Sequence, residues 1–377
     1  MADGSRPPPR QPRDFQDLLR LCMETVPQDP SSVANDQELH PLDPQRRQWL
    51  SEALSSMTTD VLREMLTNLD VIKNGLNETT ADGLLSMETV DKIQTAIDAL
   101  IDRTGSLDSA QDFCKIGGFD VFPGLLASTS DELRVSACDL RRTGSLDSAQ
   151  DFCKIGGFDV FPGLLASTSD ELRVSACELL AEVVQNESSC QQQALDSHLL
   201  DLLVRLLDDK TVADKVRVKS LYAISCVIRD NDRALQVFSK DLDGLSVLIN
   251  AVATSATSAH TDNRLKIKAS FLMSSLCQKP DICQSMYDLG LLDQLISGLQ
   301  GPHDSTHEYV LATLYALVSA HPQSRADCRH IDRQMKHFLT KRINELNGTE
   351  ELVEELDYCK RLFEILFVDN DLPESER

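Results

Sequence analysis

Two histidines stand four positions apart in the stretch GPHDSTHEY, a spacing that could bring both imidazoles to one metal ion. His303 and His307 are not part of an acidic motif such as His-Glu-x-x-His, in which the glutamate activates a zinc-bound water. A Gly-Pro pair comes just before them, so the stretch is typical of a loop that enters a helix, with Asp304 or Ser305 as N-cap. The sequence therefore predicts no metal site here.

Thiols are the other candidates for chemistry, because the chain holds eleven cysteines, none of them in a Cys-x-x-Cys pair. Most stand inside apolar stripes, as Cys177, Cys226 and Cys277 do, and a nucleophilic thiol needs a histidine partner that no motif supplies. The glycines of GGF and FPG are not followed by Lys-Ser or Lys-Thr, so they do not predict a phosphate-binding loop. We expect no enzyme, no catalytic residue and no cofactor.

The composition favours a helical protein that binds other proteins. Hydrophobic residues make up 41% of the chain and aromatic residues only 5%, so Leu, Ala and Val must build a core that suits helices. A net charge of −23 repels nucleic acid and anionic membranes. The N-terminus has no apolar signal core and no run reaches transmembrane length, so we expect a cytosolic or nuclear protein with reduced thiols. The acidic run EELVEELD is expected to be a solvated helix face.

The elements that would position a functional surface follow from a repeat. Four long helices with apolar residues at helical spacing begin at Leu172, Val216, Leu265 and His307. A shorter helix precedes each of them, with core residues at i, i+3 and i+7, and a still shorter helix precedes that one. The predicted core residues of the shorter helices are Phe158, Phe161, Leu165, Leu200, Leu203, Leu207, Leu245, Leu248, Val252, Leu292, Leu295 and Leu299.

A unit of three helices in about 40–50 residues is typical of the armadillo α-solenoid, in which each unit buries its apolar faces against its neighbours. We therefore predict an all-α fold, an armadillo-like right-handed superhelix of three-helix repeats with helical caps at both ends. The predicted organisation is a disordered arm at 1–13, a helical N-terminal region at 14–102, repeats at 103–330, capping helices at 331–368 and a disordered tail at 369–377.

One block of the chain is present twice. Arg103–Cys138 recurs without change as Arg142–Cys177, 39 positions later, an offset close to one unit. Stacking one more unit is physically possible, but the other units share only their core pattern, so identity at surface positions is not a demand of the fold. We interpret the copy as a very recent tandem duplication or an assembly artefact, superimposed on an older repeat.

Six stretches carry a resemblance to a known family: RRQWLSEAL, AQDFCKIGG, VRVKSLYAISCVIRD, LDGLSVLINAV, LKIKASFLMSSL and HEYVLATLYALV. The chain resembles the cytosolic armadillo-type nucleotide exchange factors of the seventy-kilodalton heat-shock chaperone, the Fes-one and heat-shock-binding-protein family. The resemblance covers 14–367 and is most specific over 216–317, where whole helices match. It implies binding to the chaperone's ATPase domain and promotion of ADP release. The family has one unit where this chain has two copies, and usually a glycine where His198 stands.

The third helices of an armadillo solenoid line its concave groove, and one stripe of each faces the partner. Aligning the units places aromatic and basic side chains together on this stripe, a combination that suits a protein-binding hot spot. An alternative register would place Tyr222 and Phe271 in the core. The predicted partner-binding residues are Glu178, Glu182, Lys219, Tyr222, Arg229, Lys268, Phe271, Ser275 and Thr313.

Two functions are compared. The first is a monomeric exchange factor that binds the chaperone's ATPase domain, as the resemblance implies, with no nucleic-acid or membrane partner. The alternative is an armadillo adaptor that holds a peptide or domain in its groove without exchange activity. Importin-type and catenin-type adaptors use a ladder of Trp and Asn along the third helices. In this chain, the positions equivalent to the ladder asparagines hold Glu182, Cys226, Ser275 and Leu317. The sole tryptophan, Trp49, lies outside the repeats, so the sequence favours the exchange factor.

Overall fold

A computed structural model describes residues 44–78, 84–143, 149–154, 156–253, 263–301, 303–330, 333–348 and 350–368. The chain divides into two compact units, Met1–Thr58 and Thr59–Arg377. The described part of the first unit is the start of helix α2 (Pro44–Asn77), and the rest of α2 belongs to the second unit. The predicted arm at 1–13 and the predicted tail at 369–377 lie outside the described residues.

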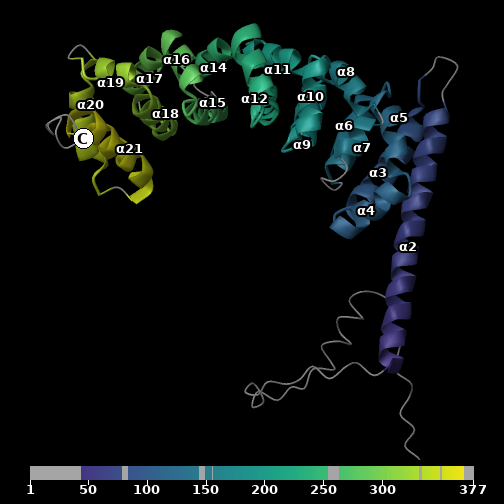
Figure 1. The fold of residues 1–377 in the computed structure, drawn as a ribbon. Helices are drawn as coiled ribbons and strands as arrows, with labels where there is room; N and C mark the ends of the chain where they lie inside the picture. The colour runs from purple at the N-terminus through teal and green to yellow at the C-terminus, as the bar shows by residue number, and fades with distance from the viewer. Residues whose placement is uncertain are drawn as a thin grey trace, which may run out of the picture. The chain divides into compact units, whose positions relative to one another are not determined.

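Helices of three kinds follow one another along the second unit (Figure 1). The first helices of the repeats are α4 (Leu107–Lys115), α7 (Ala149–Lys154), α10 (Ser188–Asp196), α13 (Asp232–Gln236), α16 (Pro280–Asp288) and α19 (Pro322–Cys328). The second helices are α5 (Phe122–Leu126), α8 (Phe161–Leu165), α11 (Leu199–Asp208), α14 (Gly244–Ala253), α17 (Leu291–Gln300) and α20 (Met335–Leu346). The third helices are α3 (Met87–Arg103), α6 (Asp131–Thr143), α9 (Asp170–Val184), α12 (Asp214–Ile228), α15 (Arg264–Leu276), α18 (His307–Ala320) and α21 (Val353–Phe363). Short 3-10 or π segments complete these elements: η1 (Gly118–Val121), η3 (Gly157–Val160), η4 (Val237–Asp241), η6 (Glu350–Leu352) and η7 (Glu364–Val368).

Each third helix packs on the third helix of the next repeat, in the order α3, α6, α9, α12, α15, α18 and α21. The second helices α8, α11, α14 and α17 form a parallel series of contacts. In Figure 1, α9, α12, α15 and α18 lie along one side of the unit, while α11, α14 and α17 lie along the other. This arrangement confirms the predicted all-α, armadillo-like solenoid. The predicted domain boundaries stay a prediction, and α3 and α21 continue the stack on either side of the predicted repeats.

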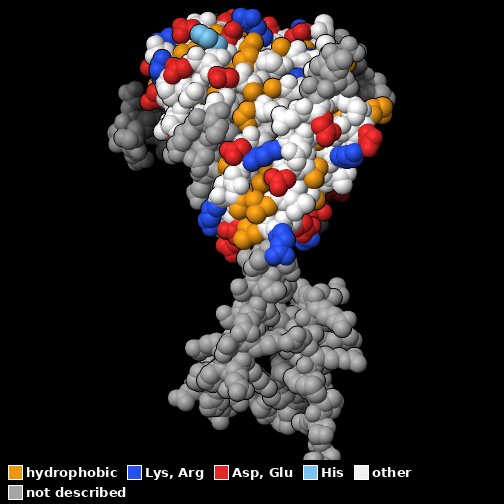
Figure 2. Space-filling view, turned by 90° about the vertical axis from the view of Figure 1, so that its right-hand side faces the viewer, with side chains coloured by type: hydrophobic (Ala, Val, Ile, Leu, Met, Phe, Trp, Pro, Cys, Tyr) orange, Lys and Arg blue, Asp and Glu red, His pale blue; other side chains and the backbone are white. Residues whose placement is uncertain are grey.

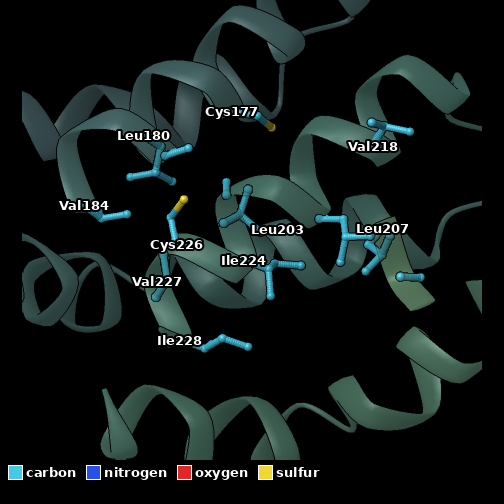
Figure 3. Close-up of a cluster of buried hydrophobic side chains, with 14 of the residues drawn as sticks. Cys177, Leu180, Val184, Leu203, Leu207, Val218, Ile224, Cys226, Val227 and Ile228 are labelled. Atoms are coloured by element: carbon cyan, nitrogen blue, oxygen red, sulfur yellow. The ribbon is translucent and has the colours of Figure 1, made fainter. Parts of the chain in front are cut away.

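The core forms where the sequence pattern places it. All twelve predicted second-helix core residues are buried, none more than 4% exposed. Figure 3 shows one such cluster, in which Leu180 of α9, Leu203 of α11 and Ile224 of α12 lie together. Burying each large aliphatic side chain contributes about 1.5–3 kcal/mol, so the stacking of neighbouring repeats is the main source of stability.

A left-handed residue precedes several second helices. Gly117, Gly156 and Gly290 have φ of 81°, 77° and 86°, and His198 takes the same place with φ of 56°. This conformation costs a residue with a Cβ about 1–2 kcal/mol, a cost that glycine does not carry. His198, which stands where the other three positions have glycine, is therefore a point of local strain.

The surface is mixed in charge. Figure 2 looks at the side of the molecule that faces right in Figure 1, where described Lys or Arg and Asp or Glu side chains alternate with small apolar groups. Among the described helices, none combines the length and apolar character that crossing a bilayer requires. The prediction that EELVEELD is solvated is wrong for Glu355, which is 1% exposed. Its Oε1 accepts a hydrogen bond from Arg342 Nε at 2.8 Å and its Oε2 lies 2.9 Å from His303 Nε2, partners that a buried carboxylate needs.

The junction between the two copies changes the core. Where the second copy continues with Leu180 and Ala181, the first continues with Arg141 and Arg142. Arg141 is 5% exposed, and its guanidinium carbon lies 5.4 Å from the ring centroid of Phe119 and 5.3 Å from that of Phe152. Its buried Nε has no hydrogen-bond partner, and burial lowers the pKa of the guanidinium. The junction thus places a desolvated cation where the equivalent position holds a fully buried leucine.

Replacing that cation tests this account. We expect Arg141→Leu to raise the free energy of unfolding by about 1 kcal/mol, because removing a desolvated charge outweighs losing two ring contacts of about 0.5–1 kcal/mol each. The matched variant is Leu180→Arg, which buries a new cation at the equivalent position and should cost about 3 kcal/mol or more. Urea unfolding of both variants measures the effects, and destabilisation by Arg141→Leu would show that the ring contacts dominate.

The second fold prediction concerns the whole copied block. Deleting Arg103–Arg141 joins Asp102 to Arg142 and restores the sequence IDRTGSLDSAQDF. Because solenoid stability is roughly a sum of unit and neighbour contributions, we expect a folded helical protein of modestly changed stability. Circular dichroism with thermal unfolding measures this. Loss of the cooperative transition would mean that the extra unit is essential to the architecture.

Candidate functional site

A cavity of about 400 Å³ opens between α12 and α15. We call it the groove cavity, and it includes five of the predicted partner-binding residues: Tyr222, Arg229, Lys268, Phe271 and Ser275. Its other lining residues are Leu221, Ser225, Ile228, Asp230, Leu235, Ile267, Leu272, Leu276, Lys279 and Tyr309. The predicted stripe on these two helices is therefore one continuous surface.

Aromatic and basic side chains meet at the centre of the groove cavity. Phe271 of α15 is 68% exposed, and Lys268 stands one turn before it. The Lys268 ammonium lies 5.8 Å from the ring centroid of Tyr222, which is half-buried against the core. Partial burial raises the pKa of the Tyr222 hydroxyl, so this group stays neutral at physiological pH. The alternative register, with both aromatic residues in the core, is wrong for Phe271.

The predicted residues of α9 lie in an ion-pair chain outside the groove cavity. Arg142 donates from Nη1 to Glu178 Oε2 at 2.7 Å and from Nε to Glu182 Oε1 at 2.8 Å. Lys219 of α12 pairs with the same Glu178. The sequence pattern did not predict Arg142, which is the first residue of the second copy and stands 39 positions before Ala181. These charges hold α6, α9 and α12 together, which leaves them less available to a partner.

Thr313 does not lie in the groove, which corrects the prediction. Its side chain is fully buried, and its Oγ1 donates to the carbonyl oxygens of Ser270 at 2.9 Å and of Tyr309 at 2.8 Å. The threonine therefore joins α18 to α15. The α18 residue that does line the groove cavity is Tyr309, one turn earlier, and Lys279 after α15 lines it as well. Neither was found from sequence, because both lie off the stripe that the alignment of units selected.

The histidines have structural partners. The His303 and His307 rings lie 4.8 Å apart, and His303 bonds to Glu355 as described above. His307 Nδ1 accepts from the Asp304 amide at 3.1 Å, while Asp304 Oδ1 accepts from the Thr306 amide at 2.8 Å. The predicted N-cap is thus wrong, because Asp304 closes the turn before the helix and Thr306 is the residue that precedes it. Within the described part of the chain, no group of three or more His, Cys, Asp or Glu side chains is placed to hold a metal ion.

The cysteines predicted to lie in the core are buried. The three cysteines predicted to lie in the core, Cys177, Cys226 and Cys277, are at most 3% exposed, as Figure 3 illustrates for the first two. Burial raises the pKa of Cys177 to about 12, so its thiol stays protonated. The third helices instead present groups that suit binding to another protein: the exposed ring of Phe271, the half-buried ring of Tyr222 and the Lys268 ammonium beside them.

Comparison with known proteins gives this surface its context. A family model described as the SIL1/FES1/HPBP1 C-terminal domain matches residues 148–261. Hsp70-binding protein 1 of Mus musculus is 30% identical over 363 residues, which cover 95% of this chain and 87% of the relative. Hsp70-binding protein 1 of Homo sapiens is 29% identical over 362 residues, which cover 95% and 86%.

Solved structures support the fold. An engineered protein aligns with a TM-score of 0.59 at 20% identity, over 78% of this chain and 67% of its own. A designed armadillo repeat protein in complex with the peptide (KR)4 aligns with a TM-score of 0.53 at 19% identity, over 66% of this chain and 98% of its own. The resemblance found in the helices is therefore confirmed, and the chain belongs to the SIL1/FES1/HPBP1 family, with the Hsp70-binding protein 1 chains among its relatives.

Proposed function

We propose that this chain is a co-chaperone that binds the ATPase domain of an Hsp70 and promotes ADP release. The observation that carries the proposal is Phe271, a large aromatic side chain that is 68% exposed in the groove cavity. An exposed aromatic side chain that stands beside a second aromatic ring and cations has the composition of a protein-binding hot spot. The relatives that align with 95% of this chain are named for binding Hsp70.

Exchange requires differential binding and no catalytic group. A protein that binds the open, nucleotide-free state of the ATPase domain more tightly than the closed ADP state weakens ADP binding by the same factor. A tenfold weakening needs about 1.4 kcal/mol of difference. A rigid solenoid can supply this difference by holding one lobe at the groove cavity while a neighbouring repeat crowds the other lobe. A non-enzymatic role follows from this mechanism.

The charges around the groove cavity indicate what the partner surface offers. Arg229, Lys268 and Lys279 line it together with one acidic residue, Asp230, in a chain of net charge −23. An acidic group beside an apolar contact on the ATPase domain would match this local reversal of charge. The overall charge disfavours nucleic acid and anionic membranes, and we propose a monomer in the cytosol, where thiols stay reduced.

The alternative, an adaptor that holds an extended peptide, has less support. Armadillo adaptors need side chains that reach the groove at the Asn-ladder positions. Cys226 and Leu317, at two of these positions, are 3% and 0% exposed, so neither can contact a peptide. The exchange factor is therefore the better-supported function, and the adaptor becomes an outcome of its test.

The direct test is ADP release. We expect the purified chain at saturation to raise the off-rate of a fluorescent ADP analogue from an Hsp70 ATPase domain by at least tenfold, which stopped-flow fluorescence measures. The chain alone should hydrolyse no ATP. Binding without a change in the off-rate would support the adaptor, and absence of binding would remove the proposal.

Substitution of the exposed aromatic residue tests the surface itself. We expect Phe271→Ala to weaken binding to the ATPase domain by about 1–3 kcal/mol, as loss of an interface anchor does. Its melting temperature should barely change, because the side chain is mostly exposed. Titration calorimetry and thermal unfolding measure the two effects.

Two further variants make that result specific. The matched control is Leu289→Ala, which removes an apolar side chain that is 45% exposed and outside the groove cavity, and which should leave affinity unchanged. Tyr222→Ala should weaken binding and also lower stability, since Tyr222 packs partly against the core. Equal affinity of Phe271→Ala and the unmodified chain would move the interface away from the groove cavity.

A further inference from the structure

Two thiols from neighbouring repeats lie in contact. Cys153 on α7 and Cys190 on α10 have their Sγ atoms 2.8 Å apart, and the two helices pack on each other. A disulfide bond is about 2.05 Å long, so the sulfurs would have to approach by only about 0.8 Å. The pair lies on the first-helix layer and plays no part in the groove cavity.

We propose that Cys153 and Cys190 form an oxidation site whose product is a disulfide between two adjacent repeats. The two thiols differ in access, because Cys153 is half-buried and Cys190 is 0% exposed. Burial, together with the contact to Cys153, raises the pKa of the Cys190 thiol to about 12, so Cys190 remains protonated. Cys153 is therefore the sulfur that meets an oxidant from solvent.

The chemistry balances with hydrogen peroxide as oxidant. The Cys153 thiolate attacks one peroxide oxygen, the O–O bond breaks, and the products are a sulfenic acid and water once the leaving hydroxide takes a proton. The Cys190 sulfur then attacks the sulfenic sulfur, the S–O bond breaks, and a second water leaves with the thiol proton. In sum, two thiols and one peroxide give one disulfide and two waters. The buried Arg141 guanidinium interacts electrostatically with both sulfurs.

Another close thiol pair shows why access matters. Cys277 and Cys283 share a side-chain hydrogen bond, and they are 0% and 1% exposed. Neither sulfur meets solvent, so a soluble peroxide should leave this pair reduced while the folded state lasts. Cys153 and Cys190 combine a close partner with one accessible sulfur.

The disulfide would constrain the stack. It closes a loop that contains α8 and α9, the second and third helices of the second copy. A cross-link of this kind stabilises mainly by restricting the unfolded chain, so the denaturant midpoint should rise on oxidation. The link would also hold α9 against the following repeat, which carries Lys219 and Tyr222 on α12.

The chain contains its own matched control. Cys114 stands in the first copy within the same sequence as Cys153, and trypsin releases the same peptide, TGSLDSAQDFCK, from both copies. Peptide mapping of the unmodified chain therefore cannot assign the reacting sulfur. Cys114→Ser and Cys153→Ser change one copy each, so each variant makes the remaining cysteine peptide unique.

The experiment treats the folded full-length chain with a small excess of hydrogen peroxide, alkylates the remaining thiols and digests with trypsin. In the unmodified chain and in Cys114→Ser, we expect a mass loss of about 2 Da, two hydrogen atoms, and TGSLDSAQDFCK linked to the peptide that contains Cys190. The urea midpoint should rise in both and return after dithiothreitol. Cys153→Ser and Cys190→Ser should show neither the link nor the rise.

Three results would overturn the proposal. Alkylation of both Cys153 and Cys190 in oxidised Cys114→Ser would mean that the contact is packing only. Conversion of Cys153 to a sulfinic acid without a linked peptide would likewise show that Cys190 does not react with the oxidised sulfur. A link that survives in Cys153→Ser would assign the chemistry to another thiol. Circular dichroism of each reduced variant confirms that the comparison is made on folded protein.

Discussion

The packing of each third helix between its two neighbours is the constraint on which the rest of the structure depends. Ten of the fifteen residues of α12 are buried. They pack with side chains of α9 and α11 in one apolar cluster, which covers most of the circumference of α12. What reaches solvent in the middle of the helix is one narrow stripe that includes Lys219, Tyr222 and Ser225. A partner on this side of the stack can therefore contact only about one residue per turn of each third helix. A wider binding surface requires stripes from adjacent repeats, as in the groove cavity.

Sequence periodicity predicts this architecture well, because a repeat must bury the same positions in every copy. It also locates Tyr222 and Phe271, since the charged residues one turn earlier, Lys219 and Lys268, mark the solvent stripe. It fails where contacts are not periodic. Thr313 bonds to a carbonyl of the preceding third helix, and a threonine in a helix pattern looks the same whether it faces water or a neighbour. Glu355 is buried because Arg342 and His303 reach it from other helices, a pairing that no local pattern contains.

The duplicated block separates what a repeat's own sequence determines from what its neighbours determine. In both copies a first, a second and a third helix follow in the same order, and both hold the same trio of packed phenylalanine rings. The residues that follow the two copies differ, however, and so do the contacts that these residues make with the next repeat. Arg141 is buried at the position that holds Leu180 after the second copy. The next residue, Arg142, forms hydrogen bonds with Glu178 and Glu182 of α9. A copied unit thus inherits its fold but not its interfaces, which is where a solenoid holds much of its stability.

Interfaces also connect stability to the proposed activity. A stack that flexed freely between α9, α12 and α15 could bind both states of the ATPase domain equally well. Equal affinity for the two states would leave their equilibrium, and so the affinity for ADP, unchanged. Differential binding needs the distance between the aromatic contact and the crowding repeat to stay fixed. The shared apolar cluster and the Arg142, Glu178 and Lys219 chain provide this rigidity without occupying the groove cavity. The proposed exchange activity would therefore depend also on residues outside the groove cavity. By keeping the stack rigid, they would set how much of the binding free energy discriminates between the two states of the ATPase domain.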